Sequence, residues 1–189
     1  MEEKDYAGCC GLYCGLCPRF QSTAPSRCLG CQVGDQHSYC SVWRCAAGTR
    51  GYLTCAECAE YPCQRLQRTL GDGVDSFISH KPAVPNLERI RGAGLKTYLG
   101  EARERRQLAE ELLEQFNEGR SMSFYCAASA LLPPDVIRQA LTEVRAAIAK
   151  ELIDGTDPKA RAKAMRATLE ELARVAGVDL KLRKAQKQD

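Results

Sequence analysis

The sequence predicts a mostly α-helical fold in which a cysteine-rich, metal-binding knuckle region at the N-terminus packs on a helical domain. Eleven of the twelve cysteines lie between Cys9 and Cys63. Beyond them, apolar residues recur at spacings of three and four, which is typical of amphipathic helices. Strand and helix patterns do not alternate, so parallel-sheet and barrel folds are disfavoured. We therefore assign residues 1–70 to a metal-binding region and residues 71–189 to a helical region, and expect the two to form one compact unit.

Composition narrows the classes of function. The net charge is +3 and 27% of the residues are charged, so neither a strong basic field nor an acidic tail points to a partner. The sequence opens without a basic segment followed by an apolar one, and it contains no apolar run of membrane-spanning length. We expect a cytoplasmic protein that does not bind membranes. No Ser/His/Asp order or phosphate-binding glycine pattern supports hydrolase or kinase chemistry.

Two short helical turns are expected within the cysteine-rich region. They cover residues 41–47 and 62–70. Pro62 suits a first helical position, and Gly71 suits a C-terminal stop. The remainder of this region is rich in Cys, Gly and turn-forming residues, as in small folds that are held together by a metal.

A long amphipathic helix is expected after Asn86 and is predicted to end at Gly119. Its apolar face consists of Leu95, Tyr98, Leu99, Ala102, Leu108, Leu112, Leu113 and Phe116. The 3.6-residue period of these positions favours one continuous helix.

Two further helices are expected towards the C-terminus. One opens at Pro134 and keeps its apolar period to Leu152, before a turn over residues 154–156. The other covers residues 158–177, with Asp157 as N-cap and Pro158 in the first turn. The Lys/Arg-rich end after Leu180 is expected to fray.

Three C-x-x-C pairs make the cysteines candidate metal ligands. Each pair offers two thiolates on one tight turn, and zinc and iron–sulfur sites need four that converge. In a cytoplasmic chain, such a density favours metal binding over disulfides. The candidate ligands are Cys10, Cys14, Cys17, Cys28, Cys31, Cys40, Cys45, Cys55, Cys58 and Cys63.

The preferred grouping of these thiolates fills two sites and leaves some sulfurs over. One site takes Cys14, Cys17, Cys28 and Cys31, and the other takes Cys45, Cys55, Cys58 and either Cys40 or Cys63. A cross-braced grouping stays open. Zinc is the preferred metal and a [4Fe–4S] cluster is the alternative, because ligand spacing does not separate zinc from iron.

Three other residues have two interpretations each. Cys9 is read as a buried apolar residue, because adjacent side chains rarely reach one ion. His37, between Cys31 and Cys40, could replace a thiolate. Cys126 is either a core residue or a reactive thiol or extra ligand; if Ser123 caps its helix, Cys126 lies in the first turn, where the helix dipole favours thiolate.

The ordered knuckles resemble a known family. The residues concerned are Cys10-Gly-Leu-Tyr-Cys14-Gly-Leu-Cys17-Pro18, Cys28-x-Gly-Cys31 and Cys55-x-x-Cys58-x-x-Tyr61-Pro62-Cys63, followed by the segments 86–92 and 117–126. Over residues 8–135 they resemble the cysteine-rich domain-of-unknown-function family numbered 3795. The resemblance implies a small prokaryotic cytoplasmic protein that binds zinc or an iron–sulfur cluster and has no agreed activity. Some members carry another cysteine near the position of Trp43, which leaves the grouping around Cys40 and Cys45 open.

The sequence thus favours a structural metal module that serves recognition of a protein partner, because a closed four-thiolate zinc site has no open position for chemistry. The alternative is an iron–sulfur or thiol-based redox protein. Nucleic-acid binding is disfavoured, because basic and aromatic residues are not interleaved in the knuckles.

Overall fold

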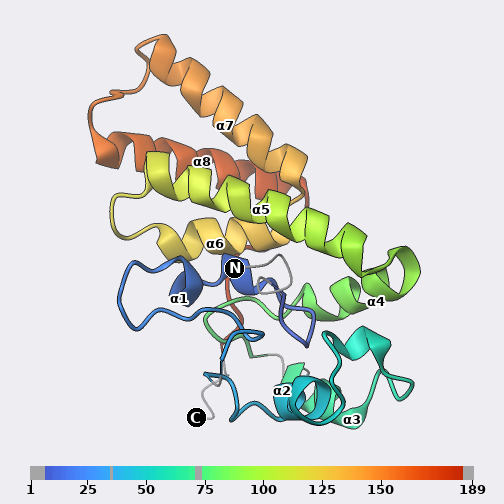
Figure 1. Cartoon of the computed structure of the whole chain (residues 1–189). Coiled ribbons are helices and arrows are strands. Elements are labelled where there is room, and N and C mark those ends of the chain that lie inside the picture. Colours follow the sequence, from blue (N-terminus) through green and yellow to red (C-terminus); the bar gives the residue numbers. More distant parts are fainter. Residues whose placement is uncertain (1–6, 35, 71–73, 185–189) are drawn as a thin grey trace, which may run out of the picture. The chain divides into compact units, whose positions relative to one another are not determined.

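The computed structural model describes residues 7–34, 36–70 and 74–184 (Figure 1). Within these ranges the chain forms eight α-helices and no strand, with an isolated bridge between Ala7 and Tyr13. The prediction of a mostly helical fold with a cysteine-rich N-terminal region is confirmed. No helix in these ranges is long and apolar enough to cross a membrane.

By packing, the chain divides into two compact units. Unit 1 comprises residues 1–103 and 182–189, and unit 2 comprises residues 104–181. The boundary expected from the sequence, at residue 70, separates a cysteine-rich composition from a helical one. It does not describe how the chain packs. All eleven cysteines of the N-terminal cluster belong to unit 1.

Unit 1 consists of short helical elements joined by turns. Its α-helices are α1 (Pro18–Gln21), α2 (Ser41–Trp43), α3 (Gln64–Leu70), α4 (Ala83–Ala93) and the first part of α5 (Leu95–Phe116). Two 3-10 turns, η2 (Cys14–Leu16) and η4 (Cys55–Glu57), and one π-helical segment, η3 (Arg44–Thr49), complete it.

The two short helical turns predicted in this region are present with different bounds. The first is α2 continued by η3, and it extends to Thr49. The second, α3, begins at Gln64, so Pro62 is not its first residue; the Tyr61–Pro62 peptide bond is cis. The predicted stop at Gly71 lies outside the described residues.

The apolar positions predicted to share one helix, from Leu95 to Phe116, do lie in a single helix, α5, but the predicted start of that helix after Asn86 is wrong. The structure has two helices, α4 and α5, separated at Gly94. Gly94 has φ of +86°, a conformation that glycine adopts without a steric penalty and that ends an α-helix. The second helix also ends earlier than predicted, at Phe116 rather than Gly119.

Helix α4 holds the segment that carries the first cysteines. The buried Asn86 side chain donates from Nδ2 to the Gly11 carbonyl at 2.8 Å and accepts at Oδ1 from the Tyr13 hydroxyl at 3.0 Å. The Tyr13 ring stacks on Tyr98 of α5, with centroids 5.4 Å apart. Gly11 itself lies against the backbone of Ala83. These contacts fix the turn that precedes Cys14.

Helix α4 also contacts η4, the turn that carries Cys55. Arg91 donates from its guanidinium to the Ala56 carbonyl at 3.1 Å. The guanidinium carbon lies 5.3 Å from the centroid of the Tyr61 ring, in cation–π geometry. One helix therefore positions both η2 and η4, although the two turns are about forty residues apart in the sequence.

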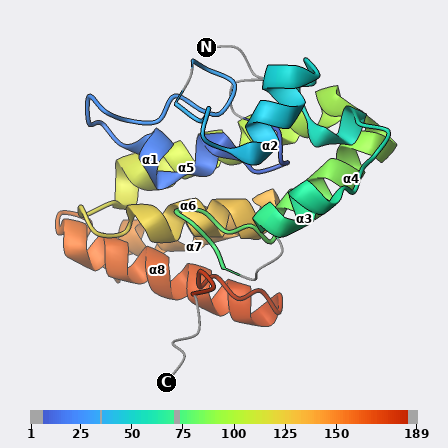
Figure 2. The ribbon, with the colours of Figure 1, turned by 90° about the horizontal axis from the view of Figure 1, so that it is seen from below.

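Unit 2 has an apolar core shared by four helices: the remainder of α5, α6 (Met122–Leu131), α7 (Pro134–Ala149) and α8 (Pro158–Val175). Helices α6, α7 and α8 run side by side (Figure 2). The core residues are Leu108, Leu112, Phe116, Tyr125, Ala128, Leu132, Ile137, Ala140, Leu141, Val144, Met165, Leu169 and Ala173. The helical spacing of the sequence identified most of these positions.

The predicted starts of α7 and α8 are confirmed, but the predicted end of α7 is wrong. Helix α8 begins at Pro158, and the Asp157 side chain caps it by accepting from Lys159 N at 2.8 Å. Helix α7 begins at Pro134 and ends at Ala149. Glu151 then takes a positive φ of 57°, and Leu152 is 75% exposed rather than part of the apolar face.

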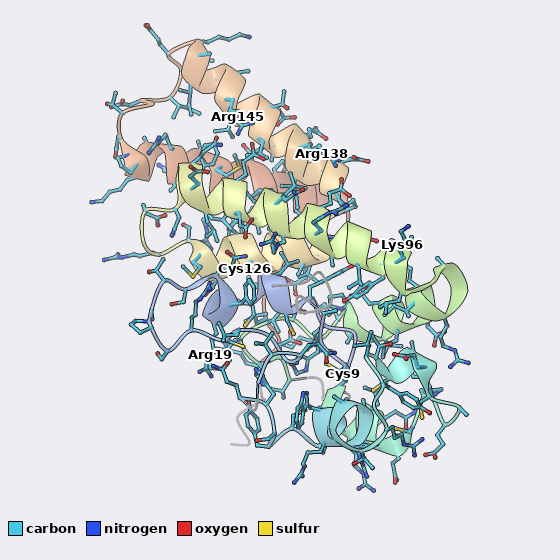
Figure 3. All side chains as sticks on the ribbon, in the orientation of Figure 1. Cys9, Arg19, Lys96, Cys126, Arg138 and Arg145 are labelled. Carbon is cyan, nitrogen blue, oxygen red and sulfur yellow. The ribbon has the colours of Figure 1, made fainter. Side chains whose placement is uncertain are left out.

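Surface ion pairs join α7 to α5 within unit 2. Arg138 and Arg145, labelled in Figure 3, pair with Glu104 and Glu111 respectively. Each of these side chains is at least one third exposed, and exposed pairs contribute about 0–1 kcal/mol. Burial of the apolar core therefore dominates the stability of this unit.

The basic segment after Leu180 was expected to fray, but it is anchored as far as Arg183. The Arg183 guanidinium and backbone N–H donate to the buried carboxylate of Asp75, each at 2.8 Å, and the Arg183 carbonyl accepts from Asp75 N at 2.9 Å. Residues 185–189 lie outside the described residues. Arg183 thus joins the segment after Leu182 to the rest of unit 1 through Asp75.

Substitution of Gly11 by alanine is expected to destabilise the protein by about 2 kcal/mol or more. Gly11 has φ of +84°, and a Cβ there would lie 2.3 Å from the Ala83 carbonyl oxygen. Gly100→Ala is the matched control, since nothing lies within 4 Å of a Cβ in that helix, and it should stabilise by about 0.5–1 kcal/mol. Urea unfolding measures both; equal effects would contradict the packing of Gly11 on α4.

The Asp75–Arg183 contact should make stability depend on pH. Burial opposes ionisation of Asp75, but the guanidinium and two backbone N–H groups outweigh it and lower the pKa to about 2. A lowered pKa stabilises the fold at neutral pH, and this contribution is lost as pH falls from about 4 towards 2. Unfolding free energies of wild type and Asp75→Asn should therefore converge over that range.

The control for this measurement is Asp135→Asn, because Asp135 is 93% exposed although it pairs with Arg138. Its free energy of unfolding should stay close to that of wild type throughout. A constant difference between wild type and Asp75→Asn from neutral to low pH would show that Asp75 does not act through its charge.

Candidate metal centre

Two of the three C-x-x-C pairs adopt the same local structure. In η2, Cys17 N donates to the Cys14 carbonyl at 3.0 Å, and in η4, Cys58 N donates to the Cys55 carbonyl at 3.2 Å. The third pair differs: Gly30 has φ of +100°, and its N–H donates to the Cys28 sulfur at 3.3 Å. In a 3-10 turn, residues i and i+3 lie on the same side, so the two thiols of a pair can approach one metal ion.

Four cysteines line one small cavity in unit 1. The lining includes Cys45 of η3, Cys55 and Cys58 at the two ends of the η4 turn, and Cys63 just before α3. The cavity volume is about 20 Å³. This volume holds about one water-sized group. Burial, together with the charges of the nearby thiols of Cys9, Cys63, Cys45 and Cys58, raises the pKa of Cys55 to about 12.

One basic side chain borders this cavity. Arg50 donates to the Cys58 sulfur at 3.1 Å and to the Glu60 carboxylate at 2.7 Å. A guanidinium at hydrogen-bond distance favours the thiolate form of a cysteine. Arg50 therefore offsets part of the negative charge that converging thiolates would create.

A second group of thiols surrounds Gly8. The sulfurs of Cys14 and Cys31 are 3.5 Å apart. A Cβ at Gly8 would lie 3.3 Å from the Cys14 sulfur and 3.4 Å from that of Cys10. The hydrogen bond between the two sulfurs lowers the pKa of Cys14 and raises the pKa of Cys31. Burial, followed by the charge of Cys14, raises the pKa of Cys10.

A third group combines one thiol with an imidazole. His37 Nε2 lies 3.1 Å from the Cys28 sulfur, and the Tyr39 hydroxyl lies 3.4 Å from His37 Nδ1. Burial, then the charge of Arg19, lowers the pKa of His37. The preferred ligand set omitted this histidine, although its position between Cys31 and Cys40 was the signal for it.

These groups can be compared with the grouping expected from the sequence. Cys63 lines the cavity with Cys45, Cys55 and Cys58, as in one of the two options. Cys40 instead acts electrostatically on Cys9 and Cys10. In the other expected set, Cys14 lies with Cys31, Cys28 lies beside His37, and Cys17 interacts electrostatically with both Cys14 and Cys28.

Cys17 and Cys9 complete the cluster. Burial raises the pKa of Cys17, while the backbone N–H groups of Arg19 and Phe20 act in the opposite direction. Cys9, labelled in Figure 3, is 2% exposed and accepts from Gln32 Nε2 at 3.4 Å. Its burial raises its pKa to about 11.

Backbone N–H groups are directed at several of these sulfurs. Those of Leu12, Cys31 and Gly30 act on Cys10, Cys14 and Cys28 respectively, in addition to the two that act on Cys17. Each such bond favours the charged thiolate. The same N–H···S bonds orient and tune sulfur ligands in metal sites.

The sulfur positions meet the needs of a metal ion only in part. Zinc–sulfur bonds of 2.3 Å in a tetrahedron put sulfurs about 3.8 Å apart, close to the 3.5 Å between Cys14 and Cys31. Over the described ranges, however, no three His, Cys, Asp or Glu side chains stand together so as to hold an ion. None of the twelve cysteines forms a disulfide. The donor chemistry fits zinc, whereas complete coordination needs side-chain reorientation.

Cys126 lies in unit 2, where its helix starts earlier than the sequence suggested. Helix α6 begins at Met122 and Ser121 precedes it, so Ser123 is not the cap. Cys126 therefore lies in the second turn, beyond the main reach of the helix dipole. Its side chain is 1% exposed, between the buried residues Tyr125 and Ala127.

Comparisons with known proteins add no relative. No protein-family model, no curated protein and no solved structure matches the chain.

Burial predicts that Cys126 reacts with thiol reagents only when unit 2 opens. Iodoacetamide labelling, mapped by mass spectrometry, should modify Cys126 in urea-unfolded protein and leave it unmodified in native protein over the same time. Labelling of native protein at the rate of the unfolded chain would instead identify Cys126 as an accessible, reactive thiol.

Proposed function

We propose that this protein is a cysteine-thiolate zinc protein in which the metal has a structural role. The first zinc ion is held by Cys45, Cys55, Cys58 and Cys63. A second is held in the group that contains Cys14 and Cys31. The metal orders the N-terminal part of unit 1 so that its helices serve recognition of a protein partner.

The observation that carries this proposal is the cavity lined by four cysteines. Cys45, Cys55, Cys58 and Cys63 come from three separate segments and face one space of about 20 Å³. Four thiolates are a complete ligand set for structural zinc. The Arg50 guanidinium lies 3.1 Å from the Cys58 sulfur. A shared cavity and a nearby cation are both expected of a thiolate site, and neither is expected of cysteines that lie together by chance.

Zinc binding at this cavity requires reorientation of the thiol side chains. Rotation of a cysteine about χ1 moves its sulfur by about 3 Å between staggered rotamers while the backbone stays in place. The backbone of η4 is held by Arg91, which donates to Ala56, and by the capping contact of Glu57 with Thr54 N at 2.7 Å. The scaffold for the ligands is thus fixed independently of the thiol rotamers.

A closed four-thiolate site favours a structural role. All four positions of the ion are taken by protein, so no substrate or water can bind to it. Because the unfolded chain has no preformed site, the free energy of metal binding adds to the free energy of folding. Redox chemistry remains the second candidate function, and the metal that is bound distinguishes the two.

Elemental analysis of tag-free, anaerobically purified protein tests this proposal. We expect about two zinc ions per chain and no visible absorbance, because Zn²⁺ has a filled d shell. Iron with matching sulfide and visible thiolate-to-iron absorbance would instead support the redox function. Absence of any bound metal after purification and after zinc reconstitution would refute both.

Cys55→Ser is the diagnostic variant and Cys126→Ser is its matched control. Cys55→Ser should lose one zinc ion per chain and lower the melting temperature, because a serine hydroxyl is a much weaker zinc ligand. Cys126→Ser changes a buried cysteine outside the cluster and should keep its full metal content. Equal zinc content in Cys55→Ser and wild type would show that the assigned cavity is not the site.

A further inference from the structure

A larger pocket opens beside the thiol cavity in unit 1. Its volume is about 430 Å³, and it is formed by α2, η3, α3 and the segment between them. Small-ligand sites fall in the range of about 300–1,000 Å³. The pocket is therefore large enough for a metabolite-sized molecule.

The charge of this pocket is positive. Arg50, Arg65 and Arg68 line it together with a single carboxylate, Glu60, so three positive charges face one negative charge. Glu60 is already paired with Arg50 at 2.7 Å. The excess charge is therefore carried mainly by Arg65 and Arg68.

Arg65 and Arg68 are placed to act together. They are three residues apart on α3, so their side chains leave the same face of the helix. Arg68 has no ion-pair partner within the described part of the chain. Two guanidinium groups on one face match the oxygens of a carboxylate or phosphate.

Neutral hydrogen-bonding groups complete the lining. The hydroxyls of Ser41 and Thr69 lie 3.4 Å apart across α2 and α3, and both residues border the pocket. The Thr69 hydroxyl already donates to the Arg65 carbonyl at 3.0 Å, so the hydroxyl donor that suits an oxyanion here is that of Ser41. The apolar part of the lining includes the thiol residues Cys45 and Cys63, which also line the small cavity.

We propose that this pocket binds a small anionic molecule, with Arg65 and Arg68 as the groups that hold its carboxylate or phosphate. The bound molecule would lie beside Cys45 and Cys63 and so beside the thiol cavity. The proposal rests on the arginines and on the volume of the pocket, and it does not require that the cavity bind zinc.

Isothermal titration calorimetry with inorganic phosphate and with succinate, at constant ionic strength, tests this proposal on the full-length protein. We expect saturable binding of at least one of the two, and the preferred probe identifies the class of anion. Arg65→Gln and Arg68→Gln should each weaken it at least tenfold, as expected for loss of a charge-assisted hydrogen bond. Both variants should keep the melting temperature and metal content of wild type.

Arg44→Gln is the matched control, because Arg44 is an exposed arginine of η3 that does not line the pocket. It removes the same charge and should leave binding unchanged. Equal weakening in Arg44→Gln, or no saturable binding of either probe in wild type, would overturn the proposal. So would binding of a labelled single-stranded oligonucleotide without binding of the small anions, because this would indicate a general polyanion surface.

Discussion

The buried side chain of Asn86 is the contact on which the organisation of unit 1 depends. Its amide satisfies both the Gly11 carbonyl and the Tyr13 hydroxyl, so two polar groups near the first cysteines are buried without loss of hydrogen bonds. Gly11 permits the close approach, since any side chain there would meet α4. Tyr98 supports the same segment, because its ring stacks on Tyr13 and its hydroxyl donates to the Gly11 carbonyl at 3.3 Å. Arg91, one turn and a half further along α4, provides the equivalent contact for η4.

The two units are stabilised by different means. Unit 2 has a continuous apolar core shared by four helices, and its exposed ion pairs contribute little. The cysteine-rich part of unit 1 consists of turns and helices of seven residues or fewer, which are marginal by themselves. It buries a few apolar side chains, such as Leu16, Val42 and Leu66, and adds single polar contacts to α4. A metal ion would add cross-links where apolar burial is least able to order the chain.

Local signals in the sequence predicted element starts better than element ends or tertiary groupings. Asp157 and Pro158 identified the start of α8, because capping is a property of neighbouring residues. The break at Gly94 was missed, since glycine is tolerated in a helical pattern and only its positive φ ends α4. Spacing put Cys14 in one set with Cys31, and Cys45 in one set with Cys55 and Cys58, but it left the choice between Cys40 and Cys63 open, because that choice depends on how the loops fold. Likewise, no pattern linked Arg65 and Arg68 to Cys45.

Electrostatics connect the thiols with the arginines around them. Burial disfavours a thiolate, and neighbouring thiolates disfavour it further, as the raised pKa of Cys55 shows. A fold that brings several cysteines together must therefore supply positive charge or accept neutral thiols. Arg50 supplies it directly at Cys58, backbone N–H groups supply partial charge at Cys10, Cys14, Cys17 and Cys28, and a metal ion would supply the most. Arg65 and Arg68 belong to α3, which begins just after Cys63. Neither donates to a sulfur within the described part of the chain. Their charge exceeds what the thiols use, and this surplus makes an external anion the fitting partner for the pocket.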